Sequence, residues 1–431
     1  MPTPADAARL ILEHIRPLEP VRCPLADALD RILAEDVTSP IDLPAWDNSA
    51  MDGYAVRAAD VQGAGGPAGG GGGRKVELCV VETVPAGTFP QKAVGAGEAI
   101  RIFTGAPIPA GADSVIRQED TEPLPDAPPP PGAPRISVTN DRDAGRNIRR
   151  RGEDIRRGEV VLAAGTALGP AQLGVLASIA CDTPLVHRAP RVAFLGSGDE
   201  IVDLDRKEEI LAGKKIATSN SYTLLGMIRH AGGVPLNLGL AADTKASLRE
   251  RLTGEGTTEA DLLVTTAGVS VGEHDLLREV LAELGAEIKL WRIRMRPGAP
   301  LAFGLLSGKP WIGLPGNPVS TMVTFELFVR PVIRRMMGHP LPFRRTVAVR
   351  VAEPITLGPK LRHYLRAVVT VNGEGTPTAR LTGPQGSAIL TSMARANALL
   401  IVPEDRPSVA AGEALRALVL DDPHHVPDPP F

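Results

Sequence analysis

Aromatic side chains are scarce in this chain, at 3% of its 431 residues, and the formal net charge is only −3. Few aromatics leave little surface on which bases could stack, and a nearly neutral charge provides no basic field for a phosphate backbone. The sequence therefore predicts that nucleic acid is not a partner.

Cysteine is equally scarce. Cys23, Cys79 and Cys181 are odd in number, lie far apart and lack the spacing of a metal site. This usage indicates a reducing compartment and no disulfide framework. The N-terminus carries Asp6 and lacks the basic and apolar regions of a signal peptide. These absences predict a cytoplasmic protein.

One uncharged stretch, residues 160–180, is long enough to cross a bilayer. Gly165, Gly169, Pro170 and Gly174 interrupt it. We therefore interpret it as a strand, a turn and a buried helix, and expect no association with a membrane.

The length and a hydrophobic content of 43% suit a chain of two to four domains with substantial cores. Between residues 188 and 340, short apolar runs alternate with helical patterns. The expected strands and helices, in chain order, cover residues 192–195, 220–230, 234–240, 243–252, 261–264, 273–284 and 311–313. This alternation predicts a doubly wound parallel sheet with helices on both faces.

The other segments are organised around this α/β domain. Residues 1–45 and 141–187 contain short helical patterns, including one at 25–33, and are expected to form a split helical domain. A small β domain, residues 46–140, is inserted between its halves, and residues 341–431 predict a C-terminal domain resembling a β-barrel.

Two low-complexity inserts lie in the region of the small β domain. Residues 63–73 are nearly all glycine, and residues 123–134 are rich in proline. Such compositions bury too little to order themselves, so both are expected to be surface linkers.

Polar loops follow the expected strands of the α/β domain. The carboxyl ends of parallel strands meet at one edge of a sheet, so these loops predict a ligand crevice. Asp199 and Glu200 end the first loop, where adjacent carboxylates suit Mg²⁺. The loop from Leu314 to Thr321 precedes a long helix, and its backbone N–H groups suit a phosphate or another oxyanion. A plain strand-to-helix turn is the alternative.

Arg292, Arg294 and Arg296 alternate with Ile293 and Met295. This alternation would place the three guanidinium groups on one face of a strand. Two interpretations remain open, an anion clamp beside the crevice and a solvated edge strand.

Gly268, Ser270 and Gly272 match the nucleophile elbow of α/β hydrolases, between an expected strand and helix. A serine hydrolase using Ser270 is therefore an alternative function. No oxyanion segment of the HGGG type appears, and no downstream histidine is an obvious partner. A non-catalytic scaffold or binding module is a third possibility.

Two further patches are rich in polar residues. Residues 44–56 include Asp47 and Asp52, and residues 145–155 mix arginines with Glu153 and Asp154. Turn chemistry at a domain junction would explain the first patch. The glycines that flank the second break helical periodicity, which favours a loop that contacts a ligand or a partner subunit.

Six motifs together resemble the molybdopterin molybdenumtransferase family of the MoeA type, which is related to the C-terminal domain of gephyrin. They are Asp47 to Val56, Thr104 to Pro109, Asn147 to Asp154, Gly198 to Glu200, Gly268 to Gly272 and Gly313 to Ser320. The resemblance implies an elongated homodimer of four-domain chains, possible contacts with other proteins of molybdenum cofactor biosynthesis, and a Mg²⁺-dependent reaction. In that reaction molybdenum from molybdate enters adenylylated molybdopterin, and AMP is released.

The positions that match functional positions of the family are Asp52, Thr104, Asp154, Glu200, Asp243, Asp275, Pro315, Pro318 and Ser387. Of these, the expected catalytic residues are Asp52, Asp154, Glu200 and Asp275, and the expected metal ligands are Asp199 and Glu200. The expected substrate-binding residues come from the family positions and from the crevice loops. They are Thr104, Asp243, Gly268, Ser270, Arg292, Arg296, Pro315, Gly316, Asn317, Pro318, Ser320 and Ser387.

The chain also departs from the family pattern. The family often has a Lys-Pro-Gly-Lys-Pro element where this chain has Arg296 to Pro300, and Arg292 stands where lysine is common. Arginine keeps the charge, but Ala299 removes one expected anion contact. Ser197 conservatively replaces a threonine. Molybdate and tungstate are nearly equal in size and charge, so both are candidate oxyanions.

Overall fold

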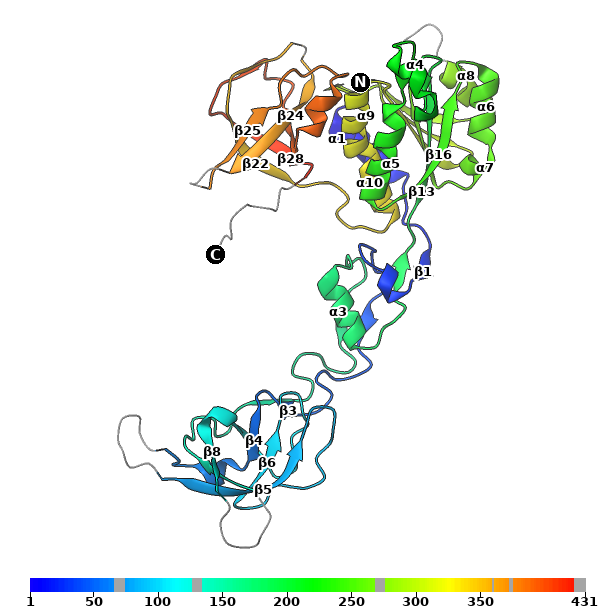
Figure 1. Ribbon diagram of the computed structural model, residues 1–431. Helices are drawn as coiled ribbons and strands as arrows, with labels where there is room; N and C mark the ends of the chain where they lie inside the picture. The colour runs from blue at the N-terminus through cyan, green and yellow to red at the C-terminus, as the bar shows by residue number, and fades with distance from the viewer. Residues whose placement is uncertain (66–73, 126–133, 268–275, 359, 372–374, 422–431) are drawn as a thin grey trace.

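The computed structural model describes residues 1–65, 74–125, 134–267, 276–358, 360–371 and 375–421. The molecule is elongated: the α/β domain and the C-terminal β domain lie at one end, and the small β domain lies at the other (Figure 1). A narrow middle segment joins the two ends. Within the described ranges, no helix is both long and apolar enough to span a membrane.

The α/β domain contains a six-stranded sheet with the order β16-β13-β17-β21-β20-β18. The strands are β13 (Arg191–Ser197), β16 (Val234–Ala241), β17 (Leu262–Thr266), β18 (Glu287–Trp291), β20 (Ala302–Leu306) and β21 (Lys309–Leu314). The first four strands in the sheet order are parallel, as predicted. The antiparallel strands β18 and β20 were not expected. A tight turn with positive φ at Ser307 and Gly308 joins β20 to β21 as a hairpin.

Helices cover both faces of this sheet, which confirms the doubly wound prediction. They are α5 (Ser219–Ala231), α6 (Lys245–Thr253), α7 (Glu255–Thr258), α8 (Leu276–Glu283), α9 (Pro318–Thr324) and α10 (Arg330–Met336), with the π-helical turn η4 (Phe325–Val329) between the last two. Leu224 and Ile228 of α5 join the core on one face, and Leu248 of α6 with Leu281 of α8 joins that on the other. α5 ends at Gly232, whose φ of 95° suits a left-handed cap.

Helix α1 (Pro4–Glu13) begins at Thr3, which forms a capping box with Asp6. Its apolar face, Ala7, Ile11 and the following Ile15, belongs to the core of the α/β domain. α1 therefore packs against α10 and η4 rather than with the middle segment.

The helix predicted at residues 25–33 is wrong. Only the 3-10 turn η1 (Leu25–Asp27) forms, and Asp30 then adopts a φ of 61°. The backbone of the following residues pairs across the chain instead: Leu33 donates to Thr166, and His187 donates to Ile32. Tertiary pairing outweighs local helical preference here.

The middle segment is built mainly from short strand pairs. β1 (Pro20–Arg22) pairs with β12 (Leu185–His187), and β2 (Val37–Thr38) pairs with β11 (Val160–Leu162). α3 (Pro170–Ser178) follows β11, as expected for residues 160–180, but Leu176 is its one buried residue. The expectation of a buried helix is therefore corrected to a mostly exposed one.

The small β domain is a six-stranded sheet with the order β7-β4-β6-β5-β9-β8. Its strands are β4 (Gly53–Val56), β5 (Val76–Val84), β6 (Glu98–Ile102), β7 (Ser114–Arg117), β8 (Thr121–Leu124) and β9 (Arg135–Val138). β8 includes the first residues of the proline-rich insert, whereas most of both inserts lies outside the described residues.

The C-terminal domain closes into a barrel because β24 pairs with both β25 and β26. Its strands are β19 (Met295–Arg296), β22 (Thr346–Val351), β24 (Arg362–Val371), β25 (Pro377–Leu381), β26 (Ala398–Val402) and β28 (Ala414–Val419). β19 comes from the α/β part of the chain and adds to the edge of β24. The barrel-like prediction is confirmed, and β19 joins the two domains.

The remaining elements are short. They are β3 (Asn48–Ser49), α2 (Ala58–Val61), η2 (Gln118–Asp120), β10 (Ile148–Arg149), β14 (Ile201–Val202), η3 (Leu204–Arg206), α4 (Lys207–Leu211), β15 (Ile216–Ala217), β23 (Ile355–Thr356), α11 (Leu390–Ala394) and β27 (Ser408–Val409).

Candidate functional site

The crevice loops lie at one edge of the sheet, as the parallel arrangement requires. In register, the end of β13 lies beside Thr266 of β17, which lies beside Leu314 of β21. The loops that follow these strands are therefore neighbours. Gly268, Ser270 and Asp275, from the loop after β17, lie outside the described residues.

Asp199 and Asp243 are held together at this edge. The backbone N–H of Asp243 donates to Asp199 Oδ1 at 3.0 Å, and the backbone N–H of Asp199 donates to Asp243 Oδ2 at 3.3 Å. Both residues are exposed. The loop after β13 and the loop after β16 therefore place two carboxylates side by side.

Glu200 is also exposed, and its carboxylate lies against Gly198. A Cβ at residue 198 would approach both Glu200 carboxylate oxygens to 3.0 Å, so a glycine with φ of 136° makes room for them. No described residue forms a hydrogen bond or an ion pair with this carboxylate. Likewise, the described part of the chain contains no group of three or more residues able to hold a metal ion.

The loop before α9 is fixed by its neighbours. Asn220 Nδ2 donates to the Gly316 carbonyl at 2.8 Å, and Asn317 Nδ2 donates to Ser387 Oγ at 3.1 Å. The carbonyl of Ser387 accepts from the Val319 N–H at 3.1 Å. Ser387 of the C-terminal domain therefore contacts the loop before α9, and its role in substrate binding stays a prediction.

The same loop presents backbone donors to solvent. Gly316 and Asn317 are exposed, and their backbone N–H groups have no hydrogen-bond partner among the described residues. Pro318 opens α9 at a position that needs no N–H, and the helix dipole points its positive end at the loop. Pro315 and Ser320, on either side of these residues, are buried.

The arginine stretch is not the regular strand that was predicted. β18 ends at Trp291, β19 begins at Met295, and Arg292 between them has a φ of 68°. Burial still alternates, because Ile293 is buried while Arg294 and Arg296 are exposed. Arg292 is half-buried, and its Nε is buried without a partner in the described chain. The three guanidinium groups therefore do not share one continuous strand face.

Arg366 is a basic residue near the crevice that the sequence analysis missed. It is 0% exposed; its Nε donates to Ser392 Oγ and its Nη2 donates to the Gly386 carbonyl, next to Ser387. Its Nη1 is buried and unpaired among the described residues, and burial lowers the pKa of Arg366 to about 10. A lone arginine within the apolar run of residues 364–369 was the available signal.

Asp52 and Thr104 lie together, but in the small β domain. Asp52 Oδ1 accepts from the backbone N–H and from the Oγ1 of Thr104, each at 2.8 Å. These bonds, first the backbone one, lower the pKa of Asp52. Asp154 is exposed on the loop that leads back to the middle segment. Figure 1 places this region at the far end of the molecule from the crevice.

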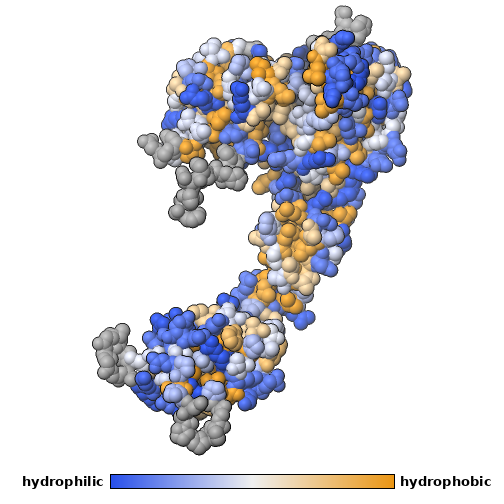
Figure 2. All heavy atoms as spheres, viewed as in Figure 1, coloured by the Kyte–Doolittle hydropathy of each residue, from blue (hydrophilic) through white to orange (hydrophobic). Residues whose placement is uncertain are grey.

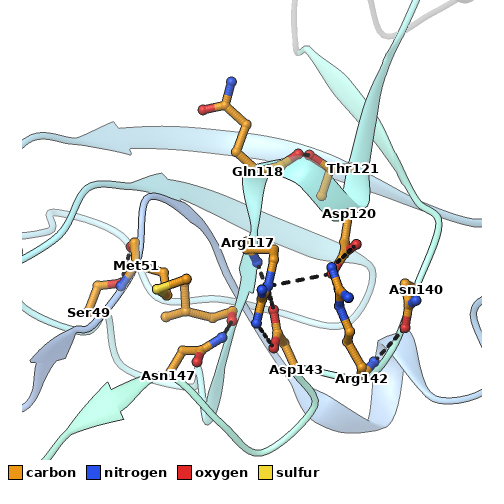
Figure 3. Close-up of polar contacts among 11 residues, drawn as sticks. Ser49, Met51, Arg117, Gln118, Asp120, Thr121, Asn140, Arg142, Asp143 and Asn147 are labelled. Carbon is orange, nitrogen blue, oxygen red and sulfur yellow. Dashed lines mark hydrogen bonds and ion pairs between the residues drawn. The ribbon is translucent and has the colours of Figure 1, made fainter. Parts of the chain in front are cut away.

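The loop of residues 145–155 is anchored at its base by a buried ion pair (Figure 3). Arg117 donates to Asp143 through Nε at 2.7 Å and Nη2 at 3.0 Å. This contact lowers the pKa of Asp143, whose side chain is 3% exposed. Asn147, with a φ of 65°, donates to the Val115 carbonyl at 2.9 Å. The start of the loop is therefore rigidly attached to the sheet.

Further along this loop, the arginines contact their own chain. Arg150 Nη1 lies 2.7 Å from Asp47 Oδ2, and Arg151 Nε lies 2.6 Å from Asp42 Oδ2. Hydrogen bonds from the Arg151 backbone and from the Arg150 side chain lower the pKa of Asp47. These pairs join the loop of residues 145–155 to the segment that leads into the small β domain, so the loop makes intramolecular contacts.

Three family models match successive parts of the chain. The MoeA N-terminal region, described as domains I and II, matches residues 3–180. A probable molybdopterin-binding domain matches residues 193–335, and the MoeA C-terminal region, domain IV, matches residues 348–420. Together they cover most of the sequence in one order.

Curated relatives match over nearly the whole length. A molybdopterin molybdenumtransferase from Nostoc is 33% identical, covering 97% of this chain and 94% of its own. The protein of that name from Haemophilus influenzae is also 33% identical, with 91% of each chain covered. Molybdopterin molybdenumtransferase 2 of Mycobacterium tuberculosis is 34% identical, with 95% and 97% covered.

A solved structure agrees with the fold. The molybdopterin biosynthesis MoeA protein of Pyrococcus horikoshii matches with a TM-score of 0.78 and 28% identity, covering 97% of this chain and 100% of its own. The predicted multidomain fold is thereby confirmed, and neither the hydrolase nor the scaffold alternative finds support among the relatives. The chain therefore belongs to the molybdopterin molybdenumtransferase family, the MoeA type predicted from its motifs.

Proposed function

We propose that this chain inserts molybdenum from molybdate into adenylylated molybdopterin and releases AMP, as a step of molybdenum cofactor biosynthesis. One observation carries the proposal: a single sheet edge presents exposed carboxylates at Glu200 and Asp243 together with N–H groups at Gly316 and Asn317 that have no partner among the described residues. The donors suit phosphates and oxyanions, and the carboxylates suit a cation that accompanies them. The names of the curated relatives support this activity.

The loop before α9 binds a phosphate of the substrate in this proposal. Asn220 orients the Gly316 peptide and Ser387 holds Asn317, so the donors are positioned before the ligand arrives. Pro315, Pro318 and Ser320 keep the loop in its conformation, and we propose Gly268 and Ser270 as further contacts to the substrate. Arg292 and Arg296 add positive charge beside it, together with Arg366.

Mg²⁺ fits the acidic residues of the crevice. This ion is usually held by one or two carboxylates together with substrate phosphates, so it does not require a cluster of three protein ligands. We propose Asp199 and Glu200 as its ligands, because both lie exposed at the end of β13, with Asp243 beside Asp199. When bound, Mg²⁺ neutralises phosphate charge and polarises the bond that releases AMP.

The proposed roles of Asp52, Thr104 and Asp154 require a second chain, because within one chain the region that carries them lies far from the crevice (Figure 1). We propose that the protein is a homodimer in which the small β domain of one chain faces the crevice of the other. The elongated shape supports this arrangement, since the two groups of predicted residues lie at opposite ends. We also infer a cytoplasmic location, which the three free cysteines support. We further propose contacts with other proteins of molybdenum cofactor biosynthesis.

The dimer proposal predicts complementation between two inactive variants. A mixed dimer of Asp52→Asn and Glu200→Gln chains, isolated through two different tags, contains one site with both native residues and one site with neither. It should recover about half of the native activity per dimer, the fraction that a count of intact shared sites requires. No recovery, or a monomer by light scattering, would contradict the shared site.

The activity itself is tested by AMP release from adenylylated molybdopterin. Purified protein should release AMP stoichiometrically with molybdenum incorporation when molybdate is supplied, and tungstate in place of molybdate compares the two oxyanions. A fluorophosphonate probe serves as the control for the hydrolase alternative and should leave Ser270 unlabelled. Labelling without AMP release would overturn the proposed function.

A further inference from the structure

A narrow neck joins the α/β domain to the arm of the molecule (Figure 1). The arm is residues 20–187, which contain the middle segment and the small β domain. The chain leaves the α/β domain after Ile15, a residue of its core, and returns to it at β13. Two segments, residues 16–19 and 188–190, therefore connect the arm to the domain that carries the crevice.

Arg188, in the returning segment, bonds both sides of this neck. Its Nη1 and Nη2 donate to the two carboxylate oxygens of Asp261, each at 2.6 Å. Its Nε donates to the carboxylate of Glu19 in the outgoing segment, and its backbone N–H donates to the Glu19 carbonyl at 3.4 Å. One guanidinium group therefore joins both connecting segments to the residue that precedes β17.

The contact between Arg188 and Asp261 is largely shielded from water. The Asp261 side chain is 14% exposed, and the Arg188 side chain is 27% exposed. Burial opposes the ionisation of Asp261, but hydrogen bonds from Arg188 and from the Arg191 N–H outweigh burial and lower the pKa of Asp261. Bidentate pairing fixes the orientation of the guanidinium group as well as its distance, so this contact resists rotation at the neck.

A second set of contacts holds the neck against α10. His187 Nδ1 donates to the Leu18 carbonyl at 2.7 Å, and the Leu18 N–H donates to the Met336 carbonyl at 2.7 Å. The His187 ring also lies against Gly338, where a Cβ would approach its Cδ2 to 2.2 Å. His187 and Arg188 thus contact different parts of the α/β domain, the end of α10 and the start of β17.

We propose that Arg188 is a positioning residue that fixes the direction of the arm and so places Asp52 and Thr104 at the crevice of the partner chain. This role rests on the proposed function, in which the two chains share their sites. The small β domain lies at the far end of the arm, so a small rotation at the neck becomes a larger displacement there (Figure 1). Misplacement of a reacting group by about 1 Å can lower a rate about a hundredfold.

A purely stabilising ion pair would have different consequences. Its loss would lower the unfolding temperature, but the direction of the arm and the turnover of the folded protein would stay the same. The direction of the arm is therefore the property to measure.

Single-molecule energy transfer between two dyes measures this direction in the full-length protein. The dyes are attached to Ala177→Cys, exposed on α3 of the arm, and Ala282→Cys, exposed on α8. The three native cysteines are replaced by serine, and excess unlabelled chain ensures that only distances within one chain are recorded. Arg188→Gln should broaden the distribution of distances.

Arg191→Gln is the matched control, because Arg191 pairs with exposed Glu259 at 3.0 Å within the α/β domain. It should leave the distribution unchanged. Arg188→Gln/Asp261→Asn should broaden the distribution no more than Arg188→Gln does, since both variants remove the same contact. This double variant leaves no buried charge unpaired, so it replaces Arg188→Gln if the single variant does not fold.

The rate of AMP release connects the neck to the reaction. Arg188→Gln should lower kcat at least about tenfold and change KM much less, because the crevice that binds the substrate stays intact. An unchanged distance distribution in both neck variants, or an unchanged kcat despite a broad distribution, would overturn the positioning role. No AMP release by the native protein would instead overturn the proposed function, and the role of Arg188 with it.

Discussion

The small β domain and the crevice of the α/β domain both concentrate acidic residues, yet they use them differently. In the small β domain, Asp52 bonds Thr104 and Asp143 bonds Arg117, both within the chain. At the crevice, the Glu200 carboxylate has no hydrogen bond or ion pair with any described residue. The small β domain and the α/β domain lie at opposite ends of the molecule (Figure 2).

This difference separates carboxylates that stabilise the chain from carboxylates that are available to a ligand. A carboxylate whose bonds are made inside the chain stabilises a loop, and its removal should cost stability. An exposed carboxylate without a partner adds little to stability and is free to act on a substrate or a metal ion. Asp52 belongs to the first kind within one chain, so any catalytic part that it plays depends on a second copy.

The largest expected effect tests the crevice side of this comparison. Glu200→Gln keeps the size and removes the charge, and it should lower AMP release about a thousandfold, roughly 4 kcal/mol. The free energy of unfolding should change little, because the native carboxylate has no described partner. Glu208→Gln, at an exposed position on α4, is the control. AMP release is measured at several Mg²⁺ concentrations. An unchanged dependence of AMP release on Mg²⁺ concentration in Glu200→Gln would exclude Glu200 as a ligand of the metal.

The next prediction tests the small β domain. Asp143→Asn leaves Arg117 without its nearly buried partner and should lower the free energy of unfolding of this domain by about 3 kcal/mol. Because Arg117 lowers the pKa of folded Asp143, the ion pair stabilises the fold at pH values above the ordinary aspartate pKa. This stabilisation is lost as the pH falls through the pKa of folded Asp143. Thermal unfolding at pH 7 and at acidic pH measures both effects.

A surface pair provides the control for that variant. Glu122→Gln removes a partner of Lys75 at 3.7 Å, where both side chains are more than half exposed. Its effect should stay below about 0.5 kcal/mol. If Asp143→Asn costs no more than Glu122→Gln, the buried pair does not stabilise the domain.

Arg366→Met should separate binding from stability within the crevice. Removing the buried guanidinium should weaken binding of phosphorylated pterin about tenfold, since one positive charge behind the Ser387 loop is lost. Stability should hold or rise, because an incompletely paired buried cation carries a desolvation penalty and methionine fills similar space. Calorimetric binding and thermal unfolding are compared with Arg366→Lys, which keeps the charge. A large loss of stability in Arg366→Met would instead make this residue a support of the loop.

The smallest effect concerns the departure from the family at Ala299. Ala299→Lys restores a charge beside the crevice and should tighten pterin binding by less than about 1 kcal/mol, as is usual for partly exposed charges. Ala299→Gln, of similar length and without charge, should leave affinity unchanged. Weaker binding by Ala299→Lys than by Ala299→Gln would exclude an anion contact at this position.

Local signals predicted the elements whose patterns are strong. The helix expected at residues 220–230 forms as α5, and the apolar strands of the α/β sheet appear where expected. Elements that depend on distant pairing were missed, because β18 and β20 become strands only as neighbours of β21. The predicted helix at residues 25–33 failed for the same reason, since its backbone pairs with the chain near Thr166.

The sequence by itself determined the family and the doubly wound sheet, and it predicted the edge at which ligands are expected, because motifs and parallel strand order need no side-chain positions. Only the tertiary structure decided which acids already have partners and that Asp52 and Glu200 lie far apart in one chain. It also placed the buried Arg366 against the Gly386 carbonyl, next to Ser387. These arrangements depend on contacts between segments far apart in the sequence, and such contacts leave no local pattern to read.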